Sequence, residues 1–208
     1  VCASNRNRVL AEFFAKGVYD AKRPFYRTMS PSMDILVSSN LERLLFEVSG
    51  RNAALTAETV TAVDISRPAL ENVERNARLN GLSNIQTRCG DVFEVLREYK
   101  ANGEKFSLVV LDPPAFCKSA AEVKDAFRGY KDINLLGMKL VKSGGFLATC
   151  SCSHYMTLPL FEKMLSEAAK ESGRRVRSVE MRSQAPDHPA LLNEEETQYL
   201  KFFILQIL

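Results

Sequence analysis

The chain alternates short apolar runs with longer stretches in which apolar residues recur every three or four positions. The short runs predict strands at 60–63, 85–89, 107–111, 145–150, 176–181 and 199–207. The longer amphipathic stretches predict helices at 68–80, 92–100, 120–141 and 157–172. Strands that alternate with helices indicate a parallel, doubly wound α/β sheet. The last two strands have no helix between them, so we expect them to form an antiparallel edge.

The first 50 residues show a different pattern. Residues 5–18 predict a short helix, and residues 19–32, which include two prolines, are expected to be mostly loop. A second helix is predicted over 32–48, because apolar residues form a broad stripe there and Gly50 ends it.

Composition limits the partners and the compartment. The chain has 208 residues, 46% of them apolar, and a net charge of +3, which is compatible with an RNA partner but does not by itself indicate one. No apolar run reaches the roughly 18 residues that a membrane span needs, and the start has no apolar signal region. The five cysteines fit no disulfide pattern, which is typical of the reducing cytoplasm.

Two acidic residues stand where predicted strands end. Asp64 closes the run at 60–63, Asp91 follows the run at 85–89, and a predicted helix follows each. Ligands of open α/β sheets bind at the carboxyl ends of the strands, where a carboxylate can accept hydrogen bonds from the ribose hydroxyls of a nucleoside cofactor. The alternative is that each aspartate caps the next helix. Two such positions in succession favour a nucleoside site.

The segment 112–116, Asp-Pro-Pro-Ala-Phe, follows a strongly apolar strand. The strand places the Asp112 carboxylate at its carboxyl end, and the two prolines restrict the backbone of the segment that follows. A site that holds a planar base requires such rigidity. Asp112 is a candidate to bind the amino edge of a flipped base, and Phe116 is a candidate to stack beside it. An ordinary turn at the end of a strand is the alternative.

The segment 149–154 brings two cysteines to the end of the strand predicted at 145–150. A thiolate that attacks C6 of a pyrimidine makes C5 nucleophilic towards an electrophilic methyl group, and cytosine needs that help. Alternation along a strand points Cys150 and Cys152 to the same face. One alternative is that both are small buried apolar residues. Another is a metal site, although Cys-x-Cys beside His154 lacks the paired spacing of zinc ligands.

Two further segments are rich in polar side chains. One is 128–134, inside a predicted helix, and the other is 187–189, in a loop before the last strand. Taken alone, both are best explained by surface charge and turn chemistry.

Seven short motifs follow one another along the chain, in an order and at a spacing that resemble those of a known family. They are Val-Asp-Ile-Ser at 63–66, Asn-Gly-Leu at 80–82, Gly-Asp-Val-Phe at 90–93, Leu-Asp-Pro-Pro-Ala-Phe at 111–116, Arg-Gly-Tyr-Lys-Asp-Ile-Asn at 128–134, Ser-Cys-Ser at 151–153 and Asp-His-Pro at 187–189. Through them, residues 59–208 resemble the bacterial 23S ribosomal RNA cytosine-5 methyltransferases, large-subunit type I, which depend on S-adenosylmethionine (SAM). The resemblance implies SAM as cofactor, 23S rRNA as substrate, no metal, and a Rossmann-like sheet.

The resemblance also implies roles for individual residues. Cys152 would be the nucleophile and Asp112 would bind the target base, with Cys150 as a neighbour. The implied cofactor-binding residues are Asp64 on the ribose, Asp91 on the adenine edge, Ile65, Val92, Asp112 and Pro113. The implied substrate-binding residues are Pro114, Phe116, Arg128, Tyr130, Lys131, Asn134 and His188.

The sequence departs from this family before residue 60. The family carries an N-terminal RNA-binding PUA domain and a β-rich linking domain, and neither pattern is found here. Its first strand and the glycine-rich turn that lets the cofactor approach the backbone are not found either. We therefore expect a sheet without its first strand, in which 60–65 pairs directly with 107–111 or 51–59 covers the gap. Low turnover is expected for the same reason.

Residues 1–50 are similar to a stretch of bacterial threonine synthase, a pyridoxal-phosphate enzyme. The similarity lies in Cys-Ala-Ser-Asn-Arg-Asn at 2–7, Lys-Gly-Val-Tyr-Asp at 16–20, Ser-Pro-Ser-Met-Asp-Ile-Leu at 30–36 and Ser-Ser-Asn-Leu-Glu-Arg-Leu at 38–44. The sequence thus predicts a helical segment at 1–50, a junction at 51–59 and a methyltransferase domain at 60–208. A threonine synthase fragment and a non-catalytic chimera are the alternative functions.

Overall fold

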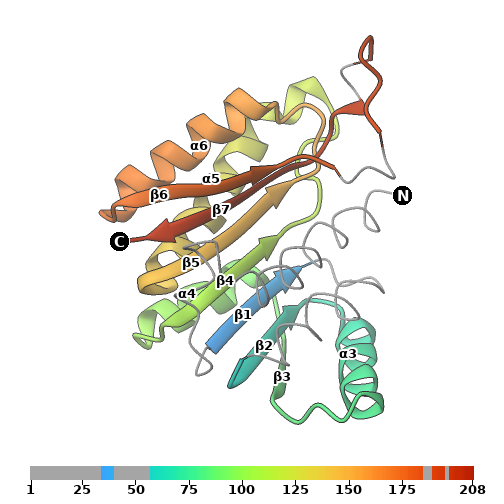
Figure 1. Ribbon diagram of the computed structural model, residues 1–208, viewed down its shortest axis with the longest axis vertical. Helices are drawn as coiled ribbons and strands as arrows, with labels where there is room; N and C mark the ends of the chain where they lie inside the picture. Colours follow the sequence, from blue (N-terminus) through green and yellow to red (C-terminus); the bar gives the residue numbers. More distant parts are fainter. Residues whose placement is uncertain (1–33, 40–56, 185–188, 195–196) are drawn as a thin grey trace, which may run out of the picture.

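The computed structural model describes residues 34–39, 57–184, 189–194 and 197–208. These residues form one seven-stranded sheet with the order β3-β2-β1-β4-β5-β7-β6 (Figure 1). The strands are β1 (Asp34–Ser39), β2 (Thr59–Asp64), β3 (Ile85–Cys89), β4 (Phe106–Asp112), β5 (Val141–Ser151), β6 (Val176–Arg182) and β7 (Lys201–Ile207). The first five strands are parallel, and β7 runs antiparallel to both β5 and β6. The predicted parallel sheet with an antiparallel C-terminal edge is confirmed.

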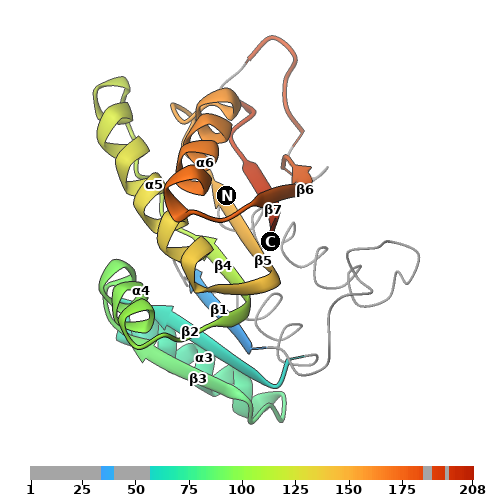
Figure 2. The same ribbon diagram turned by 90° about the vertical axis from the view of Figure 1, so that its left-hand side faces the viewer.

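Helices lie on both faces of this sheet (Figure 2). They are α3 (Arg67–Leu79), α4 (Val92–Ala101), α5 (Val123–Leu140), which the 3-10 helix η3 (Ala120–Glu122) precedes, and α6 (Leu158–Ser172). Helix α3 covers one face, and α4, α5 and α6 cover the other. These positions agree with the four helices predicted after residue 60.

The centre of the sheet corrects one prediction. Strand β1 lies between β2 and β4 and is parallel to both, with Val37 opposite Ala62 on one side and Val110 on the other. The sheet therefore has a first strand, residues 34–39 are not helical, and β2 does not pair with β4. The same apolar residues fit a helical stripe and a strand. What favours the strand is backbone pairing with two neighbours, which local periodicity does not reveal.

Some predictions fall outside the described residues. They are the helix at 5–18, the loop at 19–32, the rest of the helix at 40–48 and most of the junction, at 51–56. Among the helices that the structure describes, none is long and apolar enough to cross a membrane.

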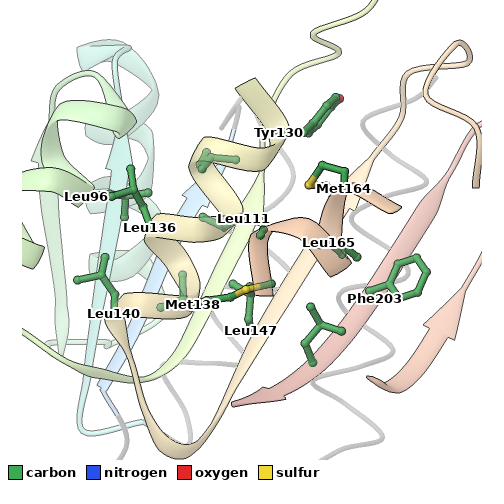
Figure 3. Packing of buried hydrophobic residues seen from close by; sticks show 14 of the residues in the cluster. Leu96, Leu111, Tyr130, Leu136, Met138, Leu140, Leu147, Met164, Leu165 and Phe203 are labelled. Atoms are coloured by element: carbon green, nitrogen blue, oxygen red, sulfur yellow. The ribbon is translucent and has the colours of Figure 1, made fainter. Parts of the chain in front are cut away.

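Two apolar cores hold the helices to the sheet, one on each face. Side chains alternate along β4, so Leu108 and Val110 belong to one core, and Leu111 belongs to the other. Figure 3 shows Leu96 of α4 and Leu136 of α5 in the second core. Full burial of each such leucine contributes about 1.5–3 kcal/mol to the free energy of folding. Packing on both faces therefore holds the carboxyl ends of the strands in fixed positions.

A glycine in β5 occupies a place where a larger residue would clash. A Cβ on Gly145 would lie 2.6 Å from the backbone oxygen of Ser107 and 2.9 Å from Cγ1 of Val141. Gly145→Ala is therefore expected to lower the free energy of unfolding by about 2–3 kcal/mol, measured by urea denaturation. Gly129→Ala is the matched control, because its Cβ would meet Phe116 at an ordinary 3.4 Å. Equal midpoints for the two variants would contradict this prediction.

Candidate functional site

The carboxyl ends of the parallel strands bring the predicted polar residues to one edge of the sheet. Asp64 ends β2, Asp91 follows β3 and Asp112 ends β4, while Cys152 directly follows β5. Because β2, β3, β4 and β5 all run in one direction, these four residues share that edge. The prediction that they do so is confirmed.

Asp64 and Asp91 differ in their local contacts. Asp64 is 6% exposed, and its carboxylate accepts a hydrogen bond of 2.6 Å from the backbone N–H of Ser66. Ser66 is the residue that caps α3, so the helix-cap interpretation of Asp64 is wrong. Asp91 does cap α4, since its carboxylate accepts hydrogen bonds from the backbone N–H groups of Phe93 at 2.8 Å and Glu94 at 3.3 Å. The cap fixes the Asp91 carboxylate, which lines the pocket described next.

A pocket of about 170 Å³ lies between these strand ends. Its lining residues are Val63, Asp64, Ile65, Gly90, Asp91, Val92, Phe93, Asp112, Pro113, Pro114 and Phe116. Apolar walls with a few carboxylates suit a nucleoside, because the walls can cover a planar ring while the carboxylates accept hydrogen bonds from hydroxyl and amino groups. Three lining residues, Val63, Gly90 and Phe93, were not predicted. All three stand inside the motifs quoted above, at 63–66 and 90–93, which is the sequence signal that could have found them.

Asp112 is held by a contact that was not predicted. The side chain is 1% exposed, and the Cys150 thiol donates a hydrogen bond to its Oδ1 at 3.0 Å. The sequence had suggested Cys150 only as a neighbour of Cys152. In the structure it fixes the orientation of the Asp112 carboxylate. Within the described residues, no group of three histidine, cysteine or carboxylate side chains is arranged to hold a metal ion.

Cys152 lies between two buried serines. The Ser151 hydroxyl donates a hydrogen bond of 3.0 Å to the hydroxyl of Tyr130, and the Ser153 hydroxyl lies 3.1 Å from that same group. Burial raises the pKa of Tyr130 to about 12, so this phenol keeps its proton at neutral pH. The sequence did not predict this cluster of three hydroxyls, although Ser-Cys-Ser shows that the serines flank the thiol.

Two of the predicted substrate-binding residues carry positive charge on α5. Arg128 is exposed and pairs with Asp125 at 3.3 Å. Lys131 pairs with Glu171 of α6 at 2.7 Å, and this hydrogen bond raises the pKa of Lys131. Neither side chain lines the pocket.

The other predicted substrate-binding residues divide between the pocket and the interior. Pro114 and Phe116 line the pocket, and the ring of Phe116 lies 4.7 Å from that of Tyr130. Tyr130 and Asn134 are fully buried in α5, and the side-chain N–H of Asn134 donates to the backbone oxygen of Tyr130 at 2.8 Å. His188 lies outside the described residues.

Comparisons with known proteins bear on this geometry. A family model described as a methyltransferase domain matches residues 43–203. Ribosomal RNA large subunit methyltransferase I of Pseudoalteromonas atlantica is 45% identical over 159 residues, which are 74% of this chain and 40% of that protein. Its counterpart in Aeromonas salmonicida is 47% identical over 152 residues, which are 72% of this chain and 38% of that protein. The chain thus spans less than half of the length of these relatives.

A solved structure shows the same fold. A putative methyltransferase complexed with SAH superposes with a TM-score of 0.74 at 16% sequence identity, covering 97% of this chain and 49% of that chain. None of these three proteins is a threonine synthase, so the similarity of residues 1–50 to that enzyme stays a prediction.

Proposed function

Because this chain belongs to the methyltransferase domain family, we propose that it transfers a methyl group from SAM to C5 of a cytosine in 23S ribosomal RNA. One observation carries the proposal: Asp64, Asp112 and Cys152 meet at one edge of the sheet, beside a pocket that suits a nucleoside. The choice of RNA is supported by the relatives, which are large-subunit rRNA methyltransferases by name. The choice of cytosine is supported by the cysteine after β5.

In this proposal the pocket binds SAM, which supplies an electrophilic methyl group. Asp64 accepts hydrogen bonds from the ribose hydroxyls, and the Ser66 N–H at 2.6 Å keeps its carboxylate in place. Asp91 and Val92 bind the adenine edge at the start of α4. Ile65 and Pro113 cover the two faces of the adenine ring. Because Ile65 is 73% exposed without a ligand, cofactor binding removes apolar surface from water.

Cys152 and Asp112 carry the chemistry. The Cys152 sulfur bonds to C6 of the cytosine, and C5 then becomes nucleophilic enough to take the methyl group from the sulfonium of SAM, which leaves as S-adenosylhomocysteine. Loss of the C5 proton and release of the thiolate restore the aromatic ring. Asp112 accepts a hydrogen bond from the amino group of the cytosine and holds the base in place for the attack. The Cys150 thiol, 3.0 Å from Oδ1, keeps that carboxylate oriented.

Most of the remaining implied substrate-binding residues contact RNA in this proposal. Pro114 and Phe116 follow Asp112 in the loop after β4, and they hold the flipped base next to the bound cofactor. Arg128, Lys131 and His188 contribute to binding the surrounding RNA. Asn134 is fully buried, so its contribution acts through the backbone of α5.

The proposal is tested by methyl transfer from radiolabelled SAM to 23S rRNA transcribed in vitro. We expect the label in 5-methylcytosine, identified by mass spectrometry of the digested nucleosides, and none on 16S rRNA. The chain should be in excess over the RNA, because no glycine follows β1 before Gly50 and turnover is expected to be slow. Label on another nucleoside, or no label after prolonged incubation, would show that the proposal is wrong.

A further inference from the structure

We propose that Tyr130 is a positioning residue whose buried hydroxyl ties the segment that carries Cys152 to the loop that follows Asp112. This inference rests on the proposed role of Cys152 as the nucleophile. It replaces the direct contact with substrate that the resemblance implies for Tyr130, because this side chain is 0% exposed and does not line the pocket.

The Tyr130 hydroxyl holds the chain on both sides of Cys152. Ser151 donates to it at 3.0 Å, and Ser153 lies at 3.1 Å. The two serines are also linked to each other, since the backbone N–H of Ser153 donates to Oγ of Ser151 at 3.2 Å. With both neighbours held by one rigid group, the backbone of Cys152 is fixed at both of its ends.

The same cluster reaches the loop after β4. The backbone N–H of Phe116 donates to the Tyr130 hydroxyl at 3.5 Å. The Tyr130 hydroxyl in turn donates to the backbone oxygen of Pro114 at 3.5 Å. The backbone N–H of Cys117 donates to Oγ of Ser153 at 3.2 Å, which makes a second link. This loop holds the base in the proposed function. The cluster therefore sets the distance between the thiol and the base.

Tyr130 is itself well fixed. Its ring lies 4.7 Å from that of Phe116 and meets the ring of Phe161 edge-on at 5.8 Å. Asn134, one turn further along α5, donates to the backbone oxygen of Tyr130. Since burial raises the pKa of Tyr130 to about 12, the hydroxyl donates as well as accepts throughout the neutral range.

Lys201 attaches the Cys152 segment from its other side. Strand β7 places Lys201 opposite Ser151, and its Nζ donates to the backbone oxygens of Ser153 at 2.6 Å and Tyr199 at 2.8 Å. The segment thus stays bound to the sheet when the Tyr130 hydroxyl is removed. Loss of the hydroxyl should loosen the segment without unfolding it, which makes the proposal testable by a conservative substitution.

Tyr130→Phe removes the hydroxyl and keeps the ring. We expect amide hydrogen exchange at Cys117 and Ser153 to rise about tenfold, with a smaller change at amides in α3. For methyl transfer, we expect kcat to fall about tenfold to a hundredfold, because the thiol is misplaced relative to the base. The KM values for SAM and RNA should change less than about twofold, because the variant keeps the binding contacts.

Tyr99→Phe is the matched control, because its ring also lies against a phenylalanine, Phe106, at 5.4 Å, but on α4. It should leave both amides and kcat unchanged. A raised KM for RNA with unchanged kcat and exchange would show a substrate contact and overturn the proposal, as would equal exchange in both variants. If the unmodified chain transfers no methyl group, the proposed function fails, and the exchange rates still decide the role of Tyr130.

Discussion

Cys152→Ala is expected to lower methyl transfer by about 10³-fold or more, while the dissociation constant for SAM changes less than about twofold. The sulfur is the atom that bonds to C6, and the neighbouring hydroxyls of Ser151 and Ser153 are weaker nucleophiles that already contact Tyr130. Cofactor binding should persist, because Cys152 does not line the pocket proposed for SAM. Radiolabelled methyl transfer and titration calorimetry with SAM, both on one preparation, measure the two quantities.

Two other cysteines provide the controls. Cys89→Ala removes a thiol at the end of β3 whose contact is the backbone oxygen of Ile65, and transfer should stay within about twofold. Cys150→Ala should lower transfer by about tenfold, because Asp112 loses a hydrogen bond that orients its carboxylate. Robust transfer by Cys152→Ala would show that the nucleophile is a different residue.

Asp64→Asn should weaken SAM binding by about tenfold to a hundredfold, the effect of losing hydrogen bonds to a charged group. Asparagine is the sharper substitution, because alanine would also leave the Ser66 N–H without its acceptor. In asparagine the side-chain oxygen can still serve that N–H, whereas the amide nitrogen cannot accept from a ribose hydroxyl. Calorimetry with SAM gives the dissociation constant of each protein directly.

Asp132→Asn is the matched control for this measurement. Asp132 is exposed on α5 and does not line the pocket, so the same change of charge should leave SAM binding within about twofold. Equal affinities of the Asp64→Asn variant and the unmodified chain would place the ribose elsewhere in the pocket.

The strand ends that form the site could be predicted because they depend on local pattern. Asp64 and Asp112 each close an apolar run in which side-chain preference and periodicity agree. Strand β1 was missed because its apolar residues also fit a helix. Its place between β2 and β4 depends on pairing with strands that begin at Thr59 and Phe106, far along the chain.

The contacts inside the site escaped prediction for a related reason. The hydrogen bond from Cys150 to Asp112 depends on the register of β4 and β5, and the near-continuous apolar runs of these buried parallel strands do not reveal that register. The Tyr130 cluster further depends on how α5 lies over β5. A weak signal did exist: Tyr130, Ile133 and Gly137 fall at helical spacing on one face, and all three are buried. That pattern indicates a core position rather than a surface that binds RNA.

The strand order β5-β7-β6 has a consequence for how the chain folds. Strand β6 comes before β7 in the chain, yet β7 is its partner among the described strands, so β6 cannot join the sheet until β7 has paired with β5. Pairing Lys201 with Ser151 closes a long loop, and such non-local contacts form slowly. Lys201 donates to the backbone oxygen of Ser153, so this contact also forms only when β7 is in place. The residues around Cys152 should therefore be the part of the site whose order depends on the pairing of β7 with β5.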